Sequence, residues 1–167
     1  MNTVRLDSNS APALILAASV LILGTALISQ YWGGLAPCQL CLYQRWPYAV
    51  AIGLAALGLF ILRGTMPRRG LTLLCGIAFA IGAGIAFYHV GVEEGFFEGP
   101  SACSGVPMEA QSIEELKKML MAAPIVRCDE VPWSLFGISM AGFNLIASVI
   151  LAVACAFVAF RPERRTA

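Results

Sequence analysis

Charged side chains are scarce in this chain of 167 residues. Aspartate, glutamate, lysine and arginine make up 13% of it and hydrophobic residues 59%, against roughly 25% and roughly 45–50% in an ordinary soluble protein. Too few polar side chains remain to coat a soluble globule, so lipid must form part of the solvent. The same figures exclude a disordered chain and an extended nucleic-acid-binding surface, and the formal net charge of +1 suggests neither DNA nor an acidic substrate.

Several cofactor motifs are also absent. The sequence contains no G-x-G-x-x-G and no P-loop, and it offers no soluble domain that could hold a nucleotide. Its single histidine, His89, cannot supply both ligands of a bis-histidine haem. Bound nucleotide and haem are therefore not expected.

Hydrophobic runs, by contrast, are long. Four stretches without Asp, Glu, Lys or Arg predict helices at about 11–31, 46–62, 70–91 and 134–160, and a helix that crosses the hydrocarbon core needs about 20 apolar residues, with a range of roughly 17–25. The first run is longer than the core of a signal peptide and no clear A-x-A site follows it, so we interpret it as a retained anchor. The sequence predicts an all-α membrane protein, a four-transmembrane-helix bundle that forms a single integral membrane domain over residues 1–167.

The few charges differ between the two sides of this bundle. Four spans place both termini and the segment 63–69 on one side, where seven arginines face two acids for a net charge of +5. The segment 93–130 on the other side carries eight acids against three basic residues, a net charge of −5. An excess of Lys and Arg in short loops marks the cytoplasmic side. Both termini are therefore predicted to be cytoplasmic, and the loops at about 32–45 and 92–133 to face outward.

The middle of the second outward loop has a helical pattern. Ser112 and Glu115 have the spacing of a capping box, and Ile113, Leu116 and Leu120 recur on one helical face. This pattern predicts a short amphipathic helix that lies on the membrane surface. A helix packed on the other outward loop is the alternative.

The six cysteines fall into two groups. Cys75 and Cys155 lie inside the third and fourth predicted helices, where cysteine usually acts as a small hydrophobic residue. The other four lie in the two outward loops, on the non-reducing side where disulfides persist; they are Cys38, Cys41, Cys103 and Cys128. One interpretation of this group is a structural pair of disulfides that staples the loops.

The other interpretation is a redox site. Cys38 and Cys41 form a C-x-x-C, a spacing that serves both metal sites and redox pairs. Zinc is disfavoured because Cys103 and Cys128 are 25 positions apart and His89 lies on a different element. The pattern therefore favours thiol chemistry over a metal centre.

The surroundings of Cys41 favour a reactive thiolate. Cys41 is expected immediately before the second helix, near a helix N-terminus, and Arg45 follows one turn later. For Arg45, an interfacial side chain that reaches for lipid phosphate is the alternative. A thiolate at the membrane surface needs an electron acceptor, and a lipid-soluble quinone suits a chain without nucleotide motifs. His89, near the outer end of the third helix, could hydrogen-bond a quinone carbonyl, although a single interfacial histidine is more often structural.

Three segments of the chain carry a family signature. They are PCQLCLYQRWPY from Pro37 to Tyr48, YHVGVEEGFFEGPSACSG from Tyr88 to Gly105, and CDEVPWSLFGISMAGFN from Cys128 to Asn144. These segments resemble the bacterial disulfide-bond formation protein B (DsbB) family, whose members are inner-membrane thiol:quinone oxidoreductases. The similarity extends over nearly the whole chain and includes the number of spans and the order of the cysteines.

The resemblance implies a relay between two cysteine pairs. A soluble periplasmic thioredoxin-fold oxidase of the DsbA type arrives reduced, and its thiolate attacks a Cys103–Cys128 disulfide at Cys103. Cys128 then exchanges with a Cys38–Cys41 disulfide at Cys38. Cys41 is left as a thiolate and donates to ubiquinone, or to menaquinone under low oxygen.

The resemblance also implies roles for other residues. Arg45 would stabilise the thiolate and the reduced ring, and His89 would lie near the quinone. Trp133 matches a tryptophan segment that enters the last helix, where an interfacial belt residue is the alternative. Gln44 stands where some members carry an acid. The competing interpretations are a dedicated paralogue that serves one substrate, an enzyme similar to vitamin K epoxide reductase, and a non-enzymatic membrane scaffold.

Overall fold

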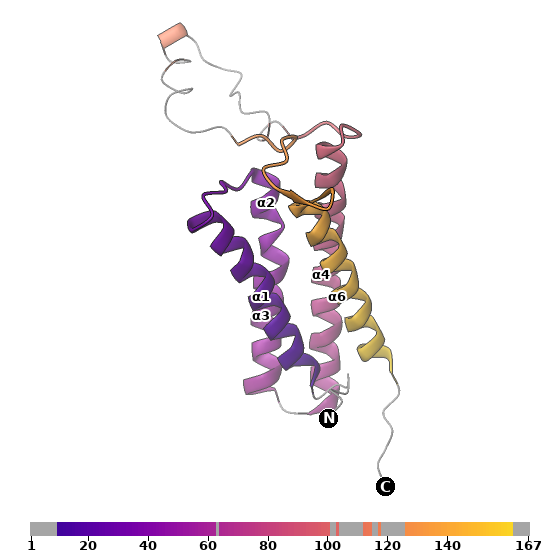
Figure 1. Ribbon diagram of the computed structural model, residues 1–167. Coiled ribbons are helices and arrows are strands. Elements are labelled where there is room, and N and C mark those ends of the chain that lie inside the picture. Colours follow the sequence, from indigo (N-terminus) through magenta and orange to yellow (C-terminus); the bar gives the residue numbers. More distant parts are fainter. Residues whose placement is uncertain are drawn as a thin grey trace.

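Four long apolar helices form the molecule (Figure 1). The computed structural model describes residues 10–62, 64–100, 103, 112–114, 117 and 126–161. Within these residues the helices are α1 (Ala11–Tyr31), a second span built from α2 (Gln39–Tyr43), α3 (Arg45–Ala56) and the π-helical η1 (Leu57–Ile61), then α4 (Thr65–Glu93) and α6 (Met140–Phe160). All four spans are long and apolar enough to cross a membrane, so the predicted four-helix membrane bundle is confirmed.

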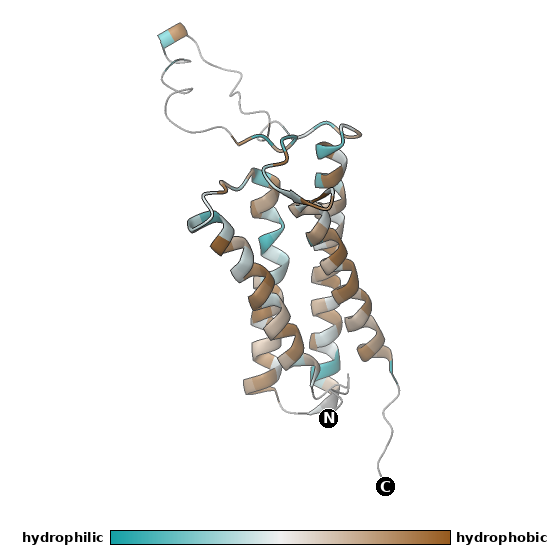
Figure 2. Ribbon diagram, viewed as in Figure 1, coloured by the Kyte–Doolittle hydropathy of each residue, from teal (hydrophilic) through white to brown (hydrophobic). Residues whose placement is uncertain are grey.

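The helices are packed in sequence order around small residues. α4 lies along both α3 and α6, and α1 packs mainly on α3. A Cβ atom added at Gly76 would lie 3.0 Å from the Cβ of Cys155, and one at Gly82 would lie 3.2 Å from Pro47. Such close approach replaces the hydrophobic effect as the source of helix association in lipid. The remaining helix surfaces are apolar along most of their length (Figure 2).

The start of α1, the end of α6 and the connection from η1 to α4 lie at one end of the bundle (Figure 1). The connection from α1 to α2, the end of α4 and the segment before α6 lie at the opposite end. This arrangement is the one expected when both termini share a side of the membrane. Each of the two outward loops therefore reaches the same end of the bundle, where the candidate site lies.

The second span begins earlier than the sequence predicts. The helix starts at Gln39, and it is interrupted at Gln44 between α2 and α3. Pro47 explains the interruption, because it has no N–H to donate to the carbonyl of Tyr43. The first turn of α3 tolerates this proline, since the N–H groups of a first turn need no helical partner.

The fourth span begins later than the predicted residue 134. β1 (Ser134–Leu135) and β2 (Ile138–Ser139) pair antiparallel and occupy the segment before α6. Phe136 and Gly137 form the two-residue turn, both with positive φ (53° and 78°), as a tight hairpin turn requires. Ser139 then caps α6 by accepting the backbone N–H of Gly142 at 3.1 Å.

The predicted amphipathic helix of the second loop falls largely outside the described residues. Of its positions the structure describes Ser112, Ile113, Glu114 and Lys117, and the last three are helical. Its placement on the membrane surface stays a prediction. The residues of both termini before 10 and after 161 also lie outside the described part of the chain.

Candidate active site

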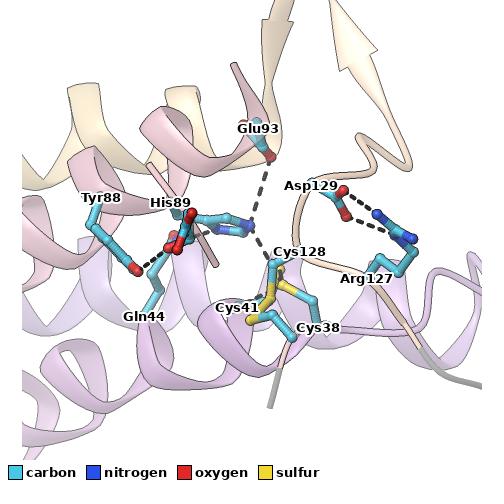
Figure 3. The surroundings of a disulfide bond; sticks show 11 residues. Cys38, Cys41, Gln44, Tyr88, His89, Glu93, Arg127, Cys128 and Asp129 are labelled. Carbon is cyan, nitrogen blue, oxygen red and sulfur yellow. Dashed lines mark hydrogen bonds and ion pairs between the residues drawn. A yellow bond between two sulfur atoms is a disulfide. The ribbon is translucent and has the colours of Figure 1, made fainter. Parts of the chain in front are cut away.

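All four loop cysteines meet at the end of the bundle that holds the connection from α1 to α2. Cys103 and Cys128 form a disulfide with Cα atoms 5.2 Å apart, the pairing that the family resemblance implies. Both pack in one buried cluster with Cys38, Leu40 and Val92. Figure 3 shows Cys128 beside Cys38 and Cys41. Two segments that are far apart in the sequence therefore bring both cysteine pairs into one site.

Cys38 and Cys41 are free thiols, and Cys38 is the one that caps a helix. Their Sγ atoms lie 2.9 Å apart, and the Cys38 Sγ accepts the backbone N–H of Cys41 at 3.2 Å. The hydrogen bond from the Cys41 thiol lowers the pKa of Cys38 well below its ordinary value, against the opposing effect of burial, and contacts with His89 and the Cys41 N–H lower it further. These contacts favour a thiolate at Cys38, whereas the sequence predicts the reactive thiolate at Cys41.

The expected position of Cys41 just before the second helix is wrong. Because α2 begins at Gln39, Cys41 lies inside the first turn and Cys38 occupies the N-cap. Arg45 begins α3 rather than continuing α2. Its Nη1 donates to Gln30 Oε1 of α1 at 2.6 Å. The guanidinium thus ties α1 to α3 beside the thiol pair.

His89 points at the thiols from α4. Its Nε2 lies 3.5 Å from the Cys38 Sγ and 3.8 Å from Glu93 Oε1 (Figure 3). On its other side, Nδ1 is 2.7 Å from the side-chain nitrogen of Gln44. The imidazole is buried, and it contacts the residues at the two ends of α2, Cys38 and Gln44. Its role towards a quinone stays a prediction, while its contact with Cys38 is direct.

Sequence reasoning missed a set of polar side chains behind His89. Asn144 of α6 donates to Gln44, and the Tyr48 hydroxyl bonds both Asn144 and Ser148. Polar residues inside spans were the signal that could have found them, because unpaired polar groups are costly in a bilayer and usually face a partner or a functional cavity. Among these residues, the sequence argument singled out Gln44 alone.

A cavity of about 510 Å³ adjoins both thiols. Its walls are mainly apolar side chains of α1 and α6, such as Leu23, Ala26 and Ala147. Cys38, Cys41, Arg45, His89 and Trp133 all line it. These five residues, all singled out from the sequence, thus face one space, while Cys103 and Cys128 pack against Cys38 outside its lining.

The thiol pair and His89 also offer three ligand atoms within 4.8 Å of one another. Thiolate and imidazole are ligands that a soft divalent ion such as Zn²⁺ accepts. A disulfide between Cys38 and Cys41 would remove two of the three. Any metal binding here would therefore be limited to the reduced pair, while the adjoining cavity suits an organic oxidant.

Comparison with known proteins places these features in a family. The family model described as "Disulfide bond formation protein DsbB" matches residues 8–158. The chain is 32% identical over 151 residues to disulfide bond formation protein B of Xylella fastidiosa (strain 9a5c), covering 86% of this chain and 85% of the relative. It is 32% identical over 154 residues to the protein of that name from Methylobacillus flagellatus, covering 87% and 89%.

An uncharacterized protein of Rickettsia prowazekii is 29% identical over 166 residues, which cover 98% of this chain and 95% of that protein. No solved structure is significantly similar to the chain. The family signal therefore rests on sequence over almost the full length of the chain.

Proposed function

Because the chain belongs to the DsbB family of disulfide bond formation proteins, we propose that it is a thiol:quinone oxidoreductase of the bacterial inner membrane. It would reoxidise a periplasmic DsbA-type dithiol protein and pass the electrons through two cysteine pairs to membrane quinone. One observation carries the proposal: both cysteine pairs adjoin one another in a buried cluster beside an apolar cavity lined by Arg45 and His89.

The first exchange would transfer two electrons from the partner's dithiol to the Cys103–Cys128 disulfide. The partner's thiolate attacks Cys103, the Cys103–Cys128 bond breaks, and resolution of the mixed disulfide leaves the partner oxidised and this pair as a dithiol. The dithiol then reduces a Cys38–Cys41 disulfide through Cys128 and regains its own bond.

The last step moves the electron pair out of the thiols. A quinone would supply a two-electron oxidant and would take up the two protons that the dithiol gives up as the Cys38–Cys41 bond re-forms. Arg45 and Cys41 are the cavity residues placed to hold it, with ubiquinone the expected form and menaquinone the alternative. The guanidinium would favour negative charge on the reduced ring, because opposite charges attract strongly where water is excluded.

The charge distribution supports the orientation. Excess arginine before α1, around the start of α4 and after α6 favours a cytoplasmic location for both termini. The cysteine pairs lie at the opposite end of the bundle, which would then face the periplasm. A soluble partner on that side would reach the second loop without crossing the bilayer.

Quinone reduction by the purified protein tests the proposal. The full chain in detergent is mixed with a reduced DsbA-type oxidase and a soluble ubiquinone analogue, and quinone absorbance is followed. We expect turnover in the wild type and none in Cys41→Ser, while Cys103→Ala should block delivery from the partner and leave Cys38–Cys41 oxidisable by quinone. Undiminished turnover by Cys103→Ala would overturn the relay.

The same assay separates the competitors. A scaffold with two stapling disulfides predicts no quinone reduction with any dithiol partner, and it predicts no change at the loop cysteines when cells are shifted to mild reductant. A dedicated paralogue predicts turnover with one particular partner and none with a general oxidase.

A further inference from the structure

A chain of hydrogen-bonded side chains runs behind the thiol pair. Ser148 Oγ lies 2.8 Å from the hydroxyl of Tyr48, which donates to Asn144 Oδ1 at 2.5 Å. Asn144 Nδ2 donates to Gln44 Oε1, and Gln44 Nε2 lies 2.7 Å from His89 Nδ1. Ser148, Tyr48, Gln44 and His89 are 0%, 2%, 6% and 3% exposed. Asn144 is partly buried and lines the cavity. The four buried residues depend on their neighbours in the hydrogen-bonded chain for polar partners.

The donors and acceptors of this chain follow from one another. The Tyr48 hydroxyl donates its single proton in a hydrogen bond to Asn144 Oδ1, so the amide nitrogen of Asn144 faces Gln44. The oxygen of Gln44 is thereby used as an acceptor, and its nitrogen faces His89. His89 Nδ1 must then accept, and the imidazole proton lies on Nε2. Reversing every amide would instead place the proton on Nδ1.

Glu93 favours the first arrangement over the reversed one. Its Oε1 lies 3.8 Å from His89 Nε2, and its Oε2 accepts the hydroxyl proton of Ser139. A lone pair on Nε2 would face this carboxylate and be repelled by it, whereas an N–H is attracted. The Cys38 Sγ lies on the same side of the ring, 3.5 Å from Nε2. Two acceptors thus converge on one ring nitrogen.

We propose that Gln44, Asn144 and Tyr48 are positioning residues that fix His89 as the Nε2–H tautomer, which donates a hydrogen bond to the Cys38 sulfur. The proposal deepens the proposed function and rests on it for its catalytic meaning. Gln44 matters because an amide, unlike a carboxylate, holds Nδ1 as an acceptor without adding charge.

The His89 tautomer matters for re-formation of the Cys38–Cys41 disulfide. The Cys38 thiolate would form the S–S bond with the Cys41 sulfur as Cys41 releases its proton and a bound quinone takes up the two electrons of the pair. A donor fixed at His89 Nε2 keeps Cys38 ionised until that moment. In the other tautomer the lone pair of Nε2 would accept a hydrogen bond from a protonated Cys38 thiol, so the neutral sulfur would be favoured over the thiolate.

Nitrogen NMR of the single histidine tests the tautomer directly. His89 is the one histidine in the sequence, so selective ¹⁵N-histidine labelling of the full chain yields one pair of ring signals. We expect a protonated Nε2 and an unprotonated Nδ1 in the dithiol protein. A protonated Nδ1, or two signals averaged between the tautomers, would overturn the proposal in the wild type alone. Neither quinone nor partner is needed, so this failure is distinguishable from failure of the proposed function.

Variants identify the positioning residues. Asn144→Leu removes the donor to Gln44 and should scramble the tautomer, and Gln44→Glu should move a proton to Nδ1 because a carboxylate accepts there. Thr72→Val is the matched control: Thr72 is a buried polar residue of α4 that bonds Arg68 O, about 25 Å from His89 along the helix. Its ring signals should equal those of the wild type. An unaltered spectrum in Asn144→Leu would mean that Asn144 does not position His89.

The alkylation rate of Cys38 against pH gives a second readout. In Asn144→Leu we expect the rate at acidic pH to fall about fivefold, the effect of one lost hydrogen bond to the sulfur. An unchanged profile would break the link between the tautomer and Cys38. Among the described residues, the titratable or charged groups near the ring are Cys38 and Cys41 of the C-x-x-C segment and Glu93 of α4. The adjoining cavity is also lined by Arg45, Tyr48, Arg127 and Glu130.

Discussion

At the scale of single residues, the helix N-cap decides which cysteine is reactive. The side chain of Cys38 accepts an N–H at the start of α2, where the helix dipole also favours negative charge. Pro37 disfavours helical conformation at the residue before it, Ala36, so the helix is not expected to extend further back. The C-x-x-C spacing predicts a redox pair but does not say which member caps the helix.

Cys38 is expected to alkylate at a pH where an ordinary thiol does not. Its lowered pKa keeps the thiolate populated as the pH falls, and reactivity is lost only when the pH drops through that lowered value. The measurement is mass spectrometry of alkylated peptides from the reduced protein across a pH series. Cys75 and Cys155, buried between the helices, should stay unmodified throughout. A rate at Cys38 that falls about tenfold per pH unit from pH 8 downward, as for a free thiol, would contradict the assignment.

At the scale of helices and strands, hydropathy predicts the spans and local backbone chemistry sets their ends. All four apolar runs became helical spans, because a helix pairs its backbone N–H and C=O groups within itself, as lipid requires. The observed helix ends differ from the predicted ones by several residues where a feature without a hydropathy pattern, such as a cap or a hairpin, sets the boundary. The hairpin turn at Phe136–Gly137 lacks the usual Asn-Gly signal, so the sequence predicted helix over β1 and β2.

Ser139 joins two of these elements, and its loss should be measurable. Ser139→Ala removes the cap on the Gly142 N–H and the hydrogen bond to Glu93. We expect a destabilisation of about 1 kcal/mol from the cap alone, seen as a lower midpoint of thermal unfolding in detergent. Ser134→Ala, in the exposed strand β1, is the matched control and should change little. Equal midpoints for the two variants would mean that Ser139 caps nothing of consequence.

At the scale of the whole molecule, the site depends on contacts that no local pattern contains. Four cysteines on one side of the membrane, with Arg45 and His89 nearby, could be predicted because topology gathers the outward loops. The partners of His89 could not be. Gln44 and Asn144 are 100 positions apart, and their contact depends on how α3 and α6 are rotated about their axes. Hydropathy is nearly uniform along these spans and leaves that rotation undetermined.

Burial of the Cys103–Cys128 disulfide implies that the cluster around it must open for exchange. Cys103 is 3% exposed and Cys128 1%, and both pack against Val92 at the end of α4. A partner thiolate reaches a sulfur only when this cluster separates, so the opening equilibrium limits the rate of attack. The side chain of Val92 holds the cluster closed through its buried methyl groups.

Val92→Ala should therefore speed reduction of the Cys103–Cys128 disulfide. The substitution removes the two Cγ methyl groups of Val92 and keeps only Cβ. This weakens the closed cluster by about 1.5 kcal/mol, which corresponds to about tenfold more of the opened form. The rate of thiol appearance in dilute dithiothreitol measures it, read at the Cys103 and Cys128 peptides. Val149→Ala, at a half-exposed position on the surface of α6, is the matched control and should leave the rate unchanged. If both variants reduce at the wild-type rate, the disulfide is attacked without opening, and the burial of Cys103 does not gate exchange.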